Sequence, residues 1–357
     1  MADISAFVDP LVAAIYEQYE KRGKAEQSRT YLGASIIGRE CSRYLWYTFR
    51  WTFKEEFDGR LIRLFQTGHM AEPRFTADLR SVGVTVYEVD PASGKQFGFE
   101  EFGGHMRGHM DGCAGGVPGG GKQWHVIEYK THSSKSFAEL KKKGVKGAKP
   151  EHWAQVNWYM GKSGMSRALY LAVNKDTEEL YSERLEFDLP DFEQTNSKAE
   201  QVIFSPSPPP RISEDSKFYL CNMCSAKAVC HQSRTPRLSC RTCVHATPER
   251  DGTWSCAKHG PQIPSQHQRQ ACPDHLPLPF LVSFAEAIDA TSDWIHFRRN
   301  DNGVEFRVHT QGTLPAHSVV PSYTSAEISA ADDHRAIGDP GVEKLRNQFG
   351  AKLAEEI

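Results

Sequence analysis

The sequence predicts an α/β fold, in which a mixed central sheet is flanked by helices and joined to a small cysteine-rich module. Two observations predict it. Between residues 61 and 204, segments with apolar residues at helical spacing alternate with shorter segments of strand length. Eight of the nine cysteines lie outside that stretch. With 357 residues and 39% hydrophobic content, the chain is long enough for a full domain and a smaller unit.

The elements follow in order along the chain. A first helix reaches about residue 28, with one apolar face formed by Phe7, Leu11, Ile15 and Tyr19. A second helix spans residues 61–79. Strands are expected at residues 84–89, 96–102, 105–112 and 124–131. A helix then begins at Pro150 and is followed by strands at 167–174 and 180–188 and a helix at 191–204.

The domain boundaries follow from composition. Residues 1–204 form the core with its N-terminal helical segment, and the Pro-rich stretch 205–210 breaks it. Residues 205–235 form a first cysteine segment, and residues 236–280 form a second, four-cysteine module. Residues 281–357 form a hairpin that turns at Asn302-Gly303, followed by a partly mobile tail with a short helix at 342–355.

The stretch from Gly108 to Lys130 contains the candidate site. Side chains alternate along a strand, so Glu128 and Lys130 point to the same face. If residues 126–130 pair with residues 105–111 as a hairpin, Asp111 lies beside them. Carboxylates at such a place suit a hard divalent cation, although an acid two residues before a lysine also occurs on ordinary solvated strands.

Two helices add polar residues in the order such a site requires. The 61–79 helix carries Glu72, with His69 one turn before it, and a surface carboxylate is the alternative interpretation of Glu72. The helix after the predicted site strand places Gln155 and Tyr159 four residues apart, on one face.

Together these motifs resemble the PD-(D/E)XK (restriction-endonuclease-like) nuclease superfamily. Glu128-Tyr129-Lys130 matches its ExK, and Gln155 and Tyr159 resemble the additional motif of the RecB-like branch. The Gly68 to Pro73 segment resembles the helix of the lambda-exonuclease/YqaJ-type recombination exonucleases. The resemblance implies that Glu72, Asp111, Glu128 and the Tyr129 carbonyl hold Mg²⁺ or Mn²⁺. It further implies that Lys130 positions the attacking water and that Gln155 and Tyr159 position the DNA strand.

The first cysteine set is Cys41, Cys221, Cys224 and Cys230. Its split arrangement resembles that of the CRISPR-associated four-cysteine nucleases, which implies a [4Fe-4S] cluster joining the two ends of the domain. Because thiolates bind both iron-sulfur clusters and zinc, zinc at the same cysteines remains open.

The second set is Cys240, Cys243, Cys256 and Cys272, in a polar stretch too poor in apolar residues to form a core unaided. A zinc ribbon is expected, with His245, His259 and His275 as alternative ligands. Cys113, the ninth cysteine, is expected to be a packed small residue.

The net charge of −2 decides nothing about nucleic acid, but basic clusters flank the predicted site. Such groups supply sequence-independent affinity for DNA phosphates. The expected DNA-binding residues are Lys141, Lys142, Lys143, Lys146 and Lys149, in a loop before the Gln155 helix, with Arg39 and Arg43 near Cys41.

No signal sequence and no apolar run of about 20 residues is evident, so a cytoplasmic protein without a membrane partner is expected. The expected function is a DNA exonuclease in phage or bacterial recombination or repair, acting on DNA with a recombination or helicase partner. Its oligomeric state is open. The alternatives are an endonuclease or strand-trimming subunit, a non-catalytic DNA-binding adaptor, and an iron-sulfur redox or sensory protein.

Overall fold

This computed structural model describes residues 9–311, 320–331 and 333–349, and the chain divides into two compact units. The N-terminal unit takes the residues up to Glu40 together with Glu55–Gln201. The C-terminal unit takes Cys41–Lys54 and the residues from Val202 onward. Cys41 therefore belongs to the same unit as the cysteines from Cys221 to Cys272.

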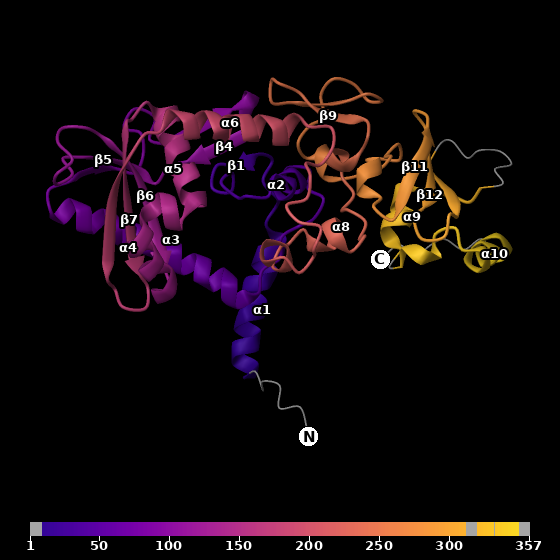
Figure 1. Ribbon diagram of the computed structural model, residues 1–357, viewed down its shortest axis with the longest axis horizontal. Helices are drawn as coiled ribbons and strands as arrows, with labels where there is room; N and C mark the ends of the chain where they lie inside the picture. The colour runs from indigo at the N-terminus through magenta and orange to yellow at the C-terminus, as the bar shows by residue number, and fades with distance from the viewer. Residues whose placement is uncertain (1–8, 312–319, 332, 350–357) are drawn as a thin grey trace. The chain divides into compact units, whose positions relative to one another are not determined.

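The N-terminal unit is built on a five-stranded sheet with the order β2-β5-β6-β7-β8 (Figure 1). β6 and β7 run parallel and the other neighbours run antiparallel, so the sheet is mixed, as predicted. A parallel pair needs a crossover, and two helices between β6 and β7 supply it. The strands are β2 (Thr85–Tyr87), β5 (Gly112–Gly115), β6 (His125–His132), β7 (Arg167–Asn174) and β8 (Leu180–Glu186).

Helices cover both faces of this sheet. On one face, α3 (Gly59–Ser81) packs through Phe75, whose ring stacks on Tyr129 at 5.0 Å between centroids. On the other face lie α4 (Ser134–Ala148) and α5 (Pro150–Ser163), where Phe137 contacts Tyr181 edge to face. The apolar residues of the α3 face form a buried core cluster of Phe75, Val84, Val86, Ala114, Val117, Ile127, Tyr129, Leu169, Leu171 and Val173. The predicted helices at 61–79 and from Pro150 are confirmed.

The predicted strand at 105–112 is wrong in one respect that matters for the site. It divides into β4 (Met106–His109) and β5, and only β5 pairs with β6. β4 belongs to a separate three-stranded sheet with β1 (Leu32–Gly33) and β3 (Gly98–Glu101), so the predicted hairpin between residues 105–111 and β6 does not form. The chain can turn between the two strands because residue 112 is glycine and has no Cβ. Any Cβ at this position would lie 2.5 Å from the Tyr87 carbonyl oxygen.

The lysine-rich segment before α5 is a helix, α4, where a loop was predicted. Its apolar residues Phe137, Leu140 and Val145 are buried against the sheet. This packing stabilises the helix, although the lysines and glycines around these residues do not by themselves indicate one. The unit also contains α1 (Pro10–Ala25), the 3₁₀ turn η1 (Phe102–Gly104) and the beginning of α6 (Leu189–Phe204).

The predicted apolar face of the first helix is not a buried face. Leu11 and Ile15 of α1 are 69% and 41% exposed, and Phe7 lies outside the described residues. α1 instead contacts α3 through its tyrosines. A Cβ on Gly59 would meet the Tyr16 backbone, and the Tyr19 hydroxyl bonds to the Gln66 side chain at 3.0 Å.

In the C-terminal unit, the buried guanidinium of Arg241 joins two parts of the chain that are far apart in sequence. It donates to the Phe49 carbonyl oxygen at 2.9 Å and lies over the Trp51 ring at 3.8 Å. Its other donors reach the Gln268 side chain at 2.9 and 3.0 Å. The segment carrying Cys41 is thereby fixed to the cysteine-rich segment.

The C-terminal unit also carries a four-stranded sheet with the order β11-β12-β13-β14. The predicted hairpin at 294–308 is confirmed, and it turns at Gly303, whose φ is +73°. The helices of this unit are α2 (Ser42–Phe49), α7 (Tyr219–Asn222), α8 (Lys227–His231), α9 (Ser325–Ala330) and α10 (Pro340–Phe349). The strands are β9 (Ala246–Pro248), β10 (Trp254–Cys256), β11 (Ala285–Ala290), β12 (Trp294–Arg299), β13 (Glu305–His309) and β14 (Ser322–Tyr323). The 3₁₀ turns are η2 (Cys240–Thr242), η3 (His267–Arg269), η4 (Pro279–Leu281) and η5 (His334–Ala336).

Part of the predicted mobile tail is ordered. Tyr323 and Ile337 are fully buried in the same core cluster as Phe306 of β13, and Ile328 of α9 joins them. The helix predicted at 342–355 is present as α10, and residues 350–355 lie outside the described chain. No helix in the described ranges is long and apolar enough to cross a membrane.

We expect Gly112→Ala to destabilise the protein by about 1–3 kcal/mol, because its φ of +154° and the nearby Tyr87 carbonyl leave no room for a methyl group. Denaturant unfolding measures the change. Gly68→Ala is the matched control, since a Cβ there meets only the Thr131 hydroxyl at 3.8 Å and the helix gains an alanine. Equal stabilities of the two variants would contradict the assigned turn.

Candidate active site

The bend between β4 and β5 brings Asp111 beside β6. Its Oδ2 accepts a hydrogen bond from the Tyr129 backbone N–H at 2.8 Å. The side chain of Glu128 lies within β6 and is only 1% exposed, and it forms an ion pair with Lys130. The structure therefore brings Asp111, Glu128 and Lys130 together, although through β5 and not through the hairpin predicted from the sequence.

The surroundings of Glu128 favour its neutral form. Burial, with the negative charges of Asp111 and Glu72, raises the pKa of Glu128 to about 7 despite the nearby Lys130 ammonium. Burial also raises the pKa of Asp111, against the Lys130 charge. The Oε2 atom of Glu128 is buried and has no hydrogen-bond partner among the described residues. A carboxylate oxygen without a partner is costly to bury, so the site is short of positive charge or donors.

Lys130 remains an ammonium ion in this site. Burial opposes its charge, but the carboxylates of Glu128, Asp111 and Glu72 outweigh that effect and raise the pKa of Lys130. A lysine that keeps its proton acts as a hydrogen-bond donor and as a positive charge, and does not act as a base.

Glu72 approaches the same group from α3. Its Oε1 lies 3.1 Å from the Nδ1 atom of His69, and both side chains are solvent-exposed. The negative charge of Glu72 contributes to the raised pKa values of Asp111 and Glu128, which places it within electrostatic range of both. Glu72, Asp111 and Glu128 do not all lie within 4.8 Å of one another, so Glu72 acts on the other two through its charge and not by direct contact.

Gln155 and Tyr159 lie on α5, and both are buried. The Gln155 Nε2 donates to the Tyr159 hydroxyl oxygen at 3.3 Å. Burial and the Glu128 charge raise the pKa of Tyr159, and a Cβ on Gly108 would lie 2.6 Å from the Tyr159 ring. The pair therefore fills the space between β4 and the carboxylate group.

A buried cluster beside Lys130 was not predicted from the sequence. The Tyr170 hydroxyl lies 2.9 Å from His132 Nε2 and 2.8 Å from His152 Nδ1. Since one hydroxyl donates only one hydrogen, one of these imidazoles donates its N–H to the Tyr170 oxygen. The alternation along β6, which sets His132 on the same face as Glu128 and Lys130, was the available signal.

Both histidines of this cluster are held neutral. Burial, with the charges of Lys149 and Lys130, lowers the pKa of His132 to about 4. Burial and the Lys130 charge lower the pKa of His152 well below its ordinary value.

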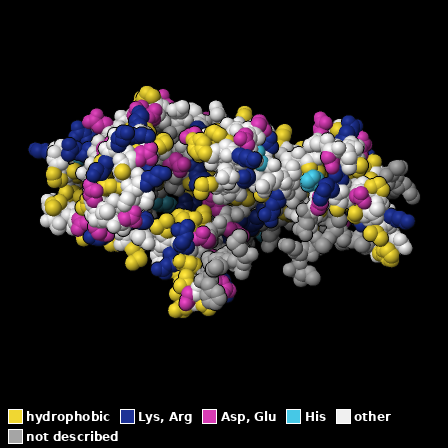
Figure 2. Space-filling view, turned by 60° about the horizontal axis from the view of Figure 1, so that its bottom comes forward, with side chains coloured by type: hydrophobic (Ala, Val, Ile, Leu, Met, Phe, Trp, Pro, Cys, Tyr) yellow, Lys and Arg dark blue, Asp and Glu magenta, His cyan; other side chains and the backbone are white. Residues whose placement is uncertain are grey.

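The lysines predicted to bind DNA have acidic neighbours. Lys141 pairs with Glu179, Lys143 with Glu139, and Lys146 with both Asp188 and Asp191. Lys142 and Lys149 lie on the same segment, at α4 and directly after it. On the face visible in Figure 2, basic and acidic side chains lie interspersed.

The two predicted arginines lie in different units. Arg39, in the N-terminal unit, lies 3.8 Å from Glu151, and Arg43, in the C-terminal unit, donates to the Tyr47 hydroxyl at 3.1 Å.

The first cysteine set gathers in the C-terminal unit. Burial raises the pKa of Cys221 and Cys224, and the thiols of Cys41 and Cys230 contribute to both shifts, so the four sulfur atoms share one neighbourhood. In the described chain no three of these sulfur atoms lie within 4.8 Å of one another. Zn–S bonds of about 2.3 Å in a tetrahedral site would place the sulfur atoms about 3.8 Å apart. Among the described residues of the second set, too, no three of the four sulfur atoms lie within 4.8 Å of one another, so this spacing does not distinguish a cluster from zinc.

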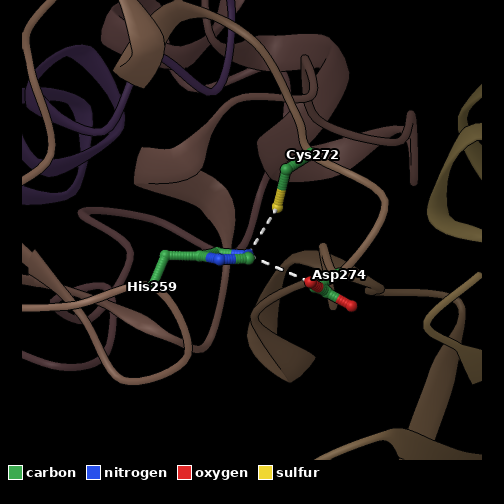
Figure 3. A group of neighbouring side chains, drawn as sticks. All are labelled: His259, Cys272 and Asp274. Atoms are coloured by element: carbon green, nitrogen blue, oxygen red, sulfur yellow. Dashed lines mark hydrogen bonds and ion pairs between the residues drawn. The ribbon is translucent and has the colours of Figure 1, made fainter. Parts of the chain in front are cut away.

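The second cysteine set lines a cavity of about 510 Å³ in the C-terminal unit, together with His245, His259 and His275. The nearest grouping of ligand atoms there is His259, Cys272 and Asp274, all within 4.8 Å of one another. The His259 ring lies between the Cys272 sulfur and the Asp274 carboxylate, 3.7 and 3.0 Å from its Nε2 atom (Figure 3). Sequence reasoning missed Asp274, although its position two residues after Cys272 was a signal.

Cys240 and Cys243 are also part of this cavity. Burial raises their pKa values to about 11 and about 12, with contributions from Cys256 and Cys272. They are neutral thiols at neutral pH unless a cation binds and displaces their protons.

No protein-family model and no curated protein sequence matches the chain. Among solved structures it is similar to SSO0001, at 13% identity over 62% of this chain and 96% of that one, with a TM-score of 0.36. It is also similar to an alkaline exonuclease (LHK-Exo) from Laribacter hongkongensis, at 17% identity over 52% of this chain and 90% of that one, with a TM-score of 0.34. The complex of LHK-Exo with dAMP is similar at 16% identity over the same shares, with a TM-score of 0.33. Similarity at this level is too distant to assign a fold family or an activity.

We expect His132 to reduce the free energy of unfolding as the pH is lowered from about 6.5 towards 4, while the raised pKa of Glu128 acts in the opposite direction over the same range. The unfolded chain binds a proton at His132 below its ordinary pKa of 6.5, whereas the folded protein resists protonation down to about 4. The loss is at most about 1.4 kcal/mol per pH unit for each such histidine. Denaturant unfolding at several pH values should give a slope of the free energy of unfolding against pH that is less positive for His132→Gln than for the wild-type protein. An unchanged slope would contradict the buried neutral state of His132.

Proposed function

We propose that this chain is a metal-dependent DNA nuclease, and that it acts as an exonuclease degrading DNA from its ends. One observation carries the proposal. The buried Glu128 carboxylate lies beside Asp111 and Lys130, and one of its oxygens has no partner among the described residues. Two carboxylates and an ammonium ion at one place, with the charge of Glu72 acting on both carboxylates, suit phosphodiester hydrolysis.

The donor set suits Mg²⁺ or Mn²⁺. Hard cations prefer carboxylate and carbonyl oxygens, and the partnerless Oε2 of Glu128 is such an oxygen. Asp111, Glu128 and Glu72 would hold the ion, with the Tyr129 carbonyl as a further ligand. A bound ion would lower the pKa of a water molecule and neutralise negative charge on the phosphate.

The remaining roles fall to the side chains around the carboxylates. Lys130 keeps its proton, so it donates to the attacking water and to the phosphate oxygens as their charge grows. Gln155 and Tyr159 are buried, and in this proposal they position the strand by fixing β4 and the Glu128 side of the site. Lys142 and Lys149, with the other lysines of α4 and with Arg39 and Arg43, would supply the affinity for DNA phosphates.

The order of motifs supports a role in recombination or repair of phage or bacterial DNA, with a recombination or helicase protein as a partner. An endonuclease or strand-trimming subunit would use the same site. The two activities differ in whether a free DNA end is needed, which a closed circular substrate tests directly.

We expect the purified protein to digest end-labelled linear DNA in the presence of Mg²⁺ or Mn²⁺, and to leave closed circles intact. Asp111→Ala and Lys130→Ala should each lower the rate by at least about a hundredfold, since each removes charge from the reacting centre. Lys175→Ala is the matched control, since this lysine pairs with the adjacent Asp176. Activity retained in Asp111→Ala or Lys130→Ala would refute the site, and cutting of circles would favour the endonuclease.

We further propose that Cys41, Cys221, Cys224 and Cys230 hold a [4Fe-4S] cluster. Their shared neighbourhood and their split arrangement along the chain support it. The cluster would tie the segment that carries Cys41 to the segment after residue 220, and so stabilise the fold by closing a long loop.

In the second cavity we propose a zinc ion. Cys240, Cys243, Cys256 and Cys272 line it, and His259 and Asp274 add nitrogen and oxygen donors next to Cys272. Sulfur, nitrogen and carboxylate ligands together suit zinc.

Elemental analysis of anaerobically purified protein separates the two sites. We expect Cys221→Ser to lose iron and the absorbance of the cluster while keeping zinc, and Cys272→Ser to lose zinc while keeping iron. Each loss should lower the temperature of unfolding, because bound metal stabilises only the folded state. Loss of the same metal in both variants would contradict the assignment of two separate sites.

A further inference from the structure

Two aromatic side chains are stacked on the surface of the central sheet. The rings of Tyr87 and Trp124 lie 5.6 Å apart between centroids, at an interplanar angle of 30°. Each residue is 42% exposed. Tyr87 ends β2, the edge strand of the sheet, and Trp124 directly precedes β6. More than half of each side chain is therefore covered by protein, and the rest faces solvent.

The sheet register places this pair on the face that carries Glu128. Tyr87 lies opposite Cys113, and Cys113 lies opposite Val126. Because side chains alternate, Val126 and Glu128 share a face, and Tyr87 shares it with them. The opposite face holds Val86, Ala114 and Ile127 in the core cluster beneath α3. The aromatic pair and the candidate active site therefore lie on one surface.

The pair is also close to the carboxylates along that surface. Tyr87 pairs with Cys113, which is two residues from Asp111, and a Cβ on the intervening Gly112 would lie 2.5 Å from the Tyr87 carbonyl oxygen.

The local backbone keeps the indole of Trp124 in place. A Cβ on Gly115 would lie 3.0 Å from the Trp124 ring, so the glycine provides the space in which the indole lies. The loop before Trp124 is held by two arginines, since Arg184 donates to the Pro118 carbonyl at 2.9 Å and Arg167 to the Gly120 carbonyl at 3.1 Å. The same loop carries the exposed Lys122.

We propose that Tyr87 and Trp124 form a stacking platform for an unpaired base of the DNA strand whose phosphate reaches Asp111 and Glu128. This inference rests on the proposed nuclease function for the path of the strand. Exposed aromatic faces bind bases of any sequence, and a neighbouring lysine suits the adjacent phosphate. A base is the occupant that the position favours, because the platform continues the surface of a phosphodiesterase-type site.

The test measures binding and cleavage separately. Binding of a short single-stranded oligonucleotide is followed by fluorescence anisotropy in EDTA. Trp124→Ala and Tyr87→Ala should each weaken binding about tenfold, and Trp124→Phe and Tyr87→Phe should restore most of it. Phe280→Ala is the matched control, since Phe280 is 54% exposed and lies in the other unit. Circular dichroism verifies that every variant is folded.

A set of oligonucleotides with one abasic position then identifies the stacked base. In the wild-type protein, one abasic position near the cleaved end should weaken binding as much as Trp124→Ala does, and the two changes together should add little. Unchanged binding in Trp124→Ala and Tyr87→Ala, or additive losses at every abasic position, would overturn the platform. If Tyr87 and Trp124 instead bind a protein, both alanine variants should keep normal affinity for DNA. That result would overturn the platform as well.

The outcomes distinguish the platform from the nuclease itself. If the wild-type protein cleaves DNA and the alanine variants bind and cleave normally, the platform is wrong and the nuclease stands. If the wild-type protein cleaves no DNA while the alanine variants lose affinity for the intact strand alone, the nuclease is wrong and a base-stacking surface stands.

Discussion

The hydrogen bond from the Tyr129 amide to the Asp111 carboxylate is the constraint on which the candidate site depends. It fixes Asp111, the residue directly before β5, beside Glu128 and Lys130 of β6. The turn between β4 and β5 requires glycine at residue 112, next to Asp111. The φ of Gly112 is +154°, and a Cβ there would lie 2.5 Å from the Tyr87 carbonyl oxygen. A short backbone feature therefore decides where two carboxylates meet.

Placing the carboxylates of Asp111 and Glu128 close together in a buried site has an electrostatic cost that the surrounding residues do not remove. Glu128 is buried with one oxygen unpartnered among the described residues, and its pKa rises to about 7 as a result. Lys130 offsets part of that cost, and the neutral cluster of His132, Tyr170 and His152 adds no charge. Strain of this kind is typical of sites that await a ligand, and a divalent cation is the ligand that the donor set fits.

The C-terminal unit shows a second way of stabilising a chain that is poor in apolar residues. Arg241 lies among aromatic rings and joins the segment of Cys41 to the segment of Gln268. Two groups of cysteines lie in the same unit, and the second lines a cavity with His259 and Asp274. The imidazole and carboxylate donors beside Cys272 are the physical reason to propose zinc there.

The sequence by itself determined the features that depend on local periodicity. The helix around Glu72, the helix from Pro150 and the hairpin at Gly303 follow from spacing and turn chemistry, and alternation along β6 set Glu128 and Lys130 on one face. The tertiary structure alone decided that β4 leaves the central sheet, that the lysine-rich segment is helical, and that Asp274 joins His259 and Cys272. Those outcomes depend on strand partners, on burial and on contacts between residues distant in sequence, which local patterns do not encode.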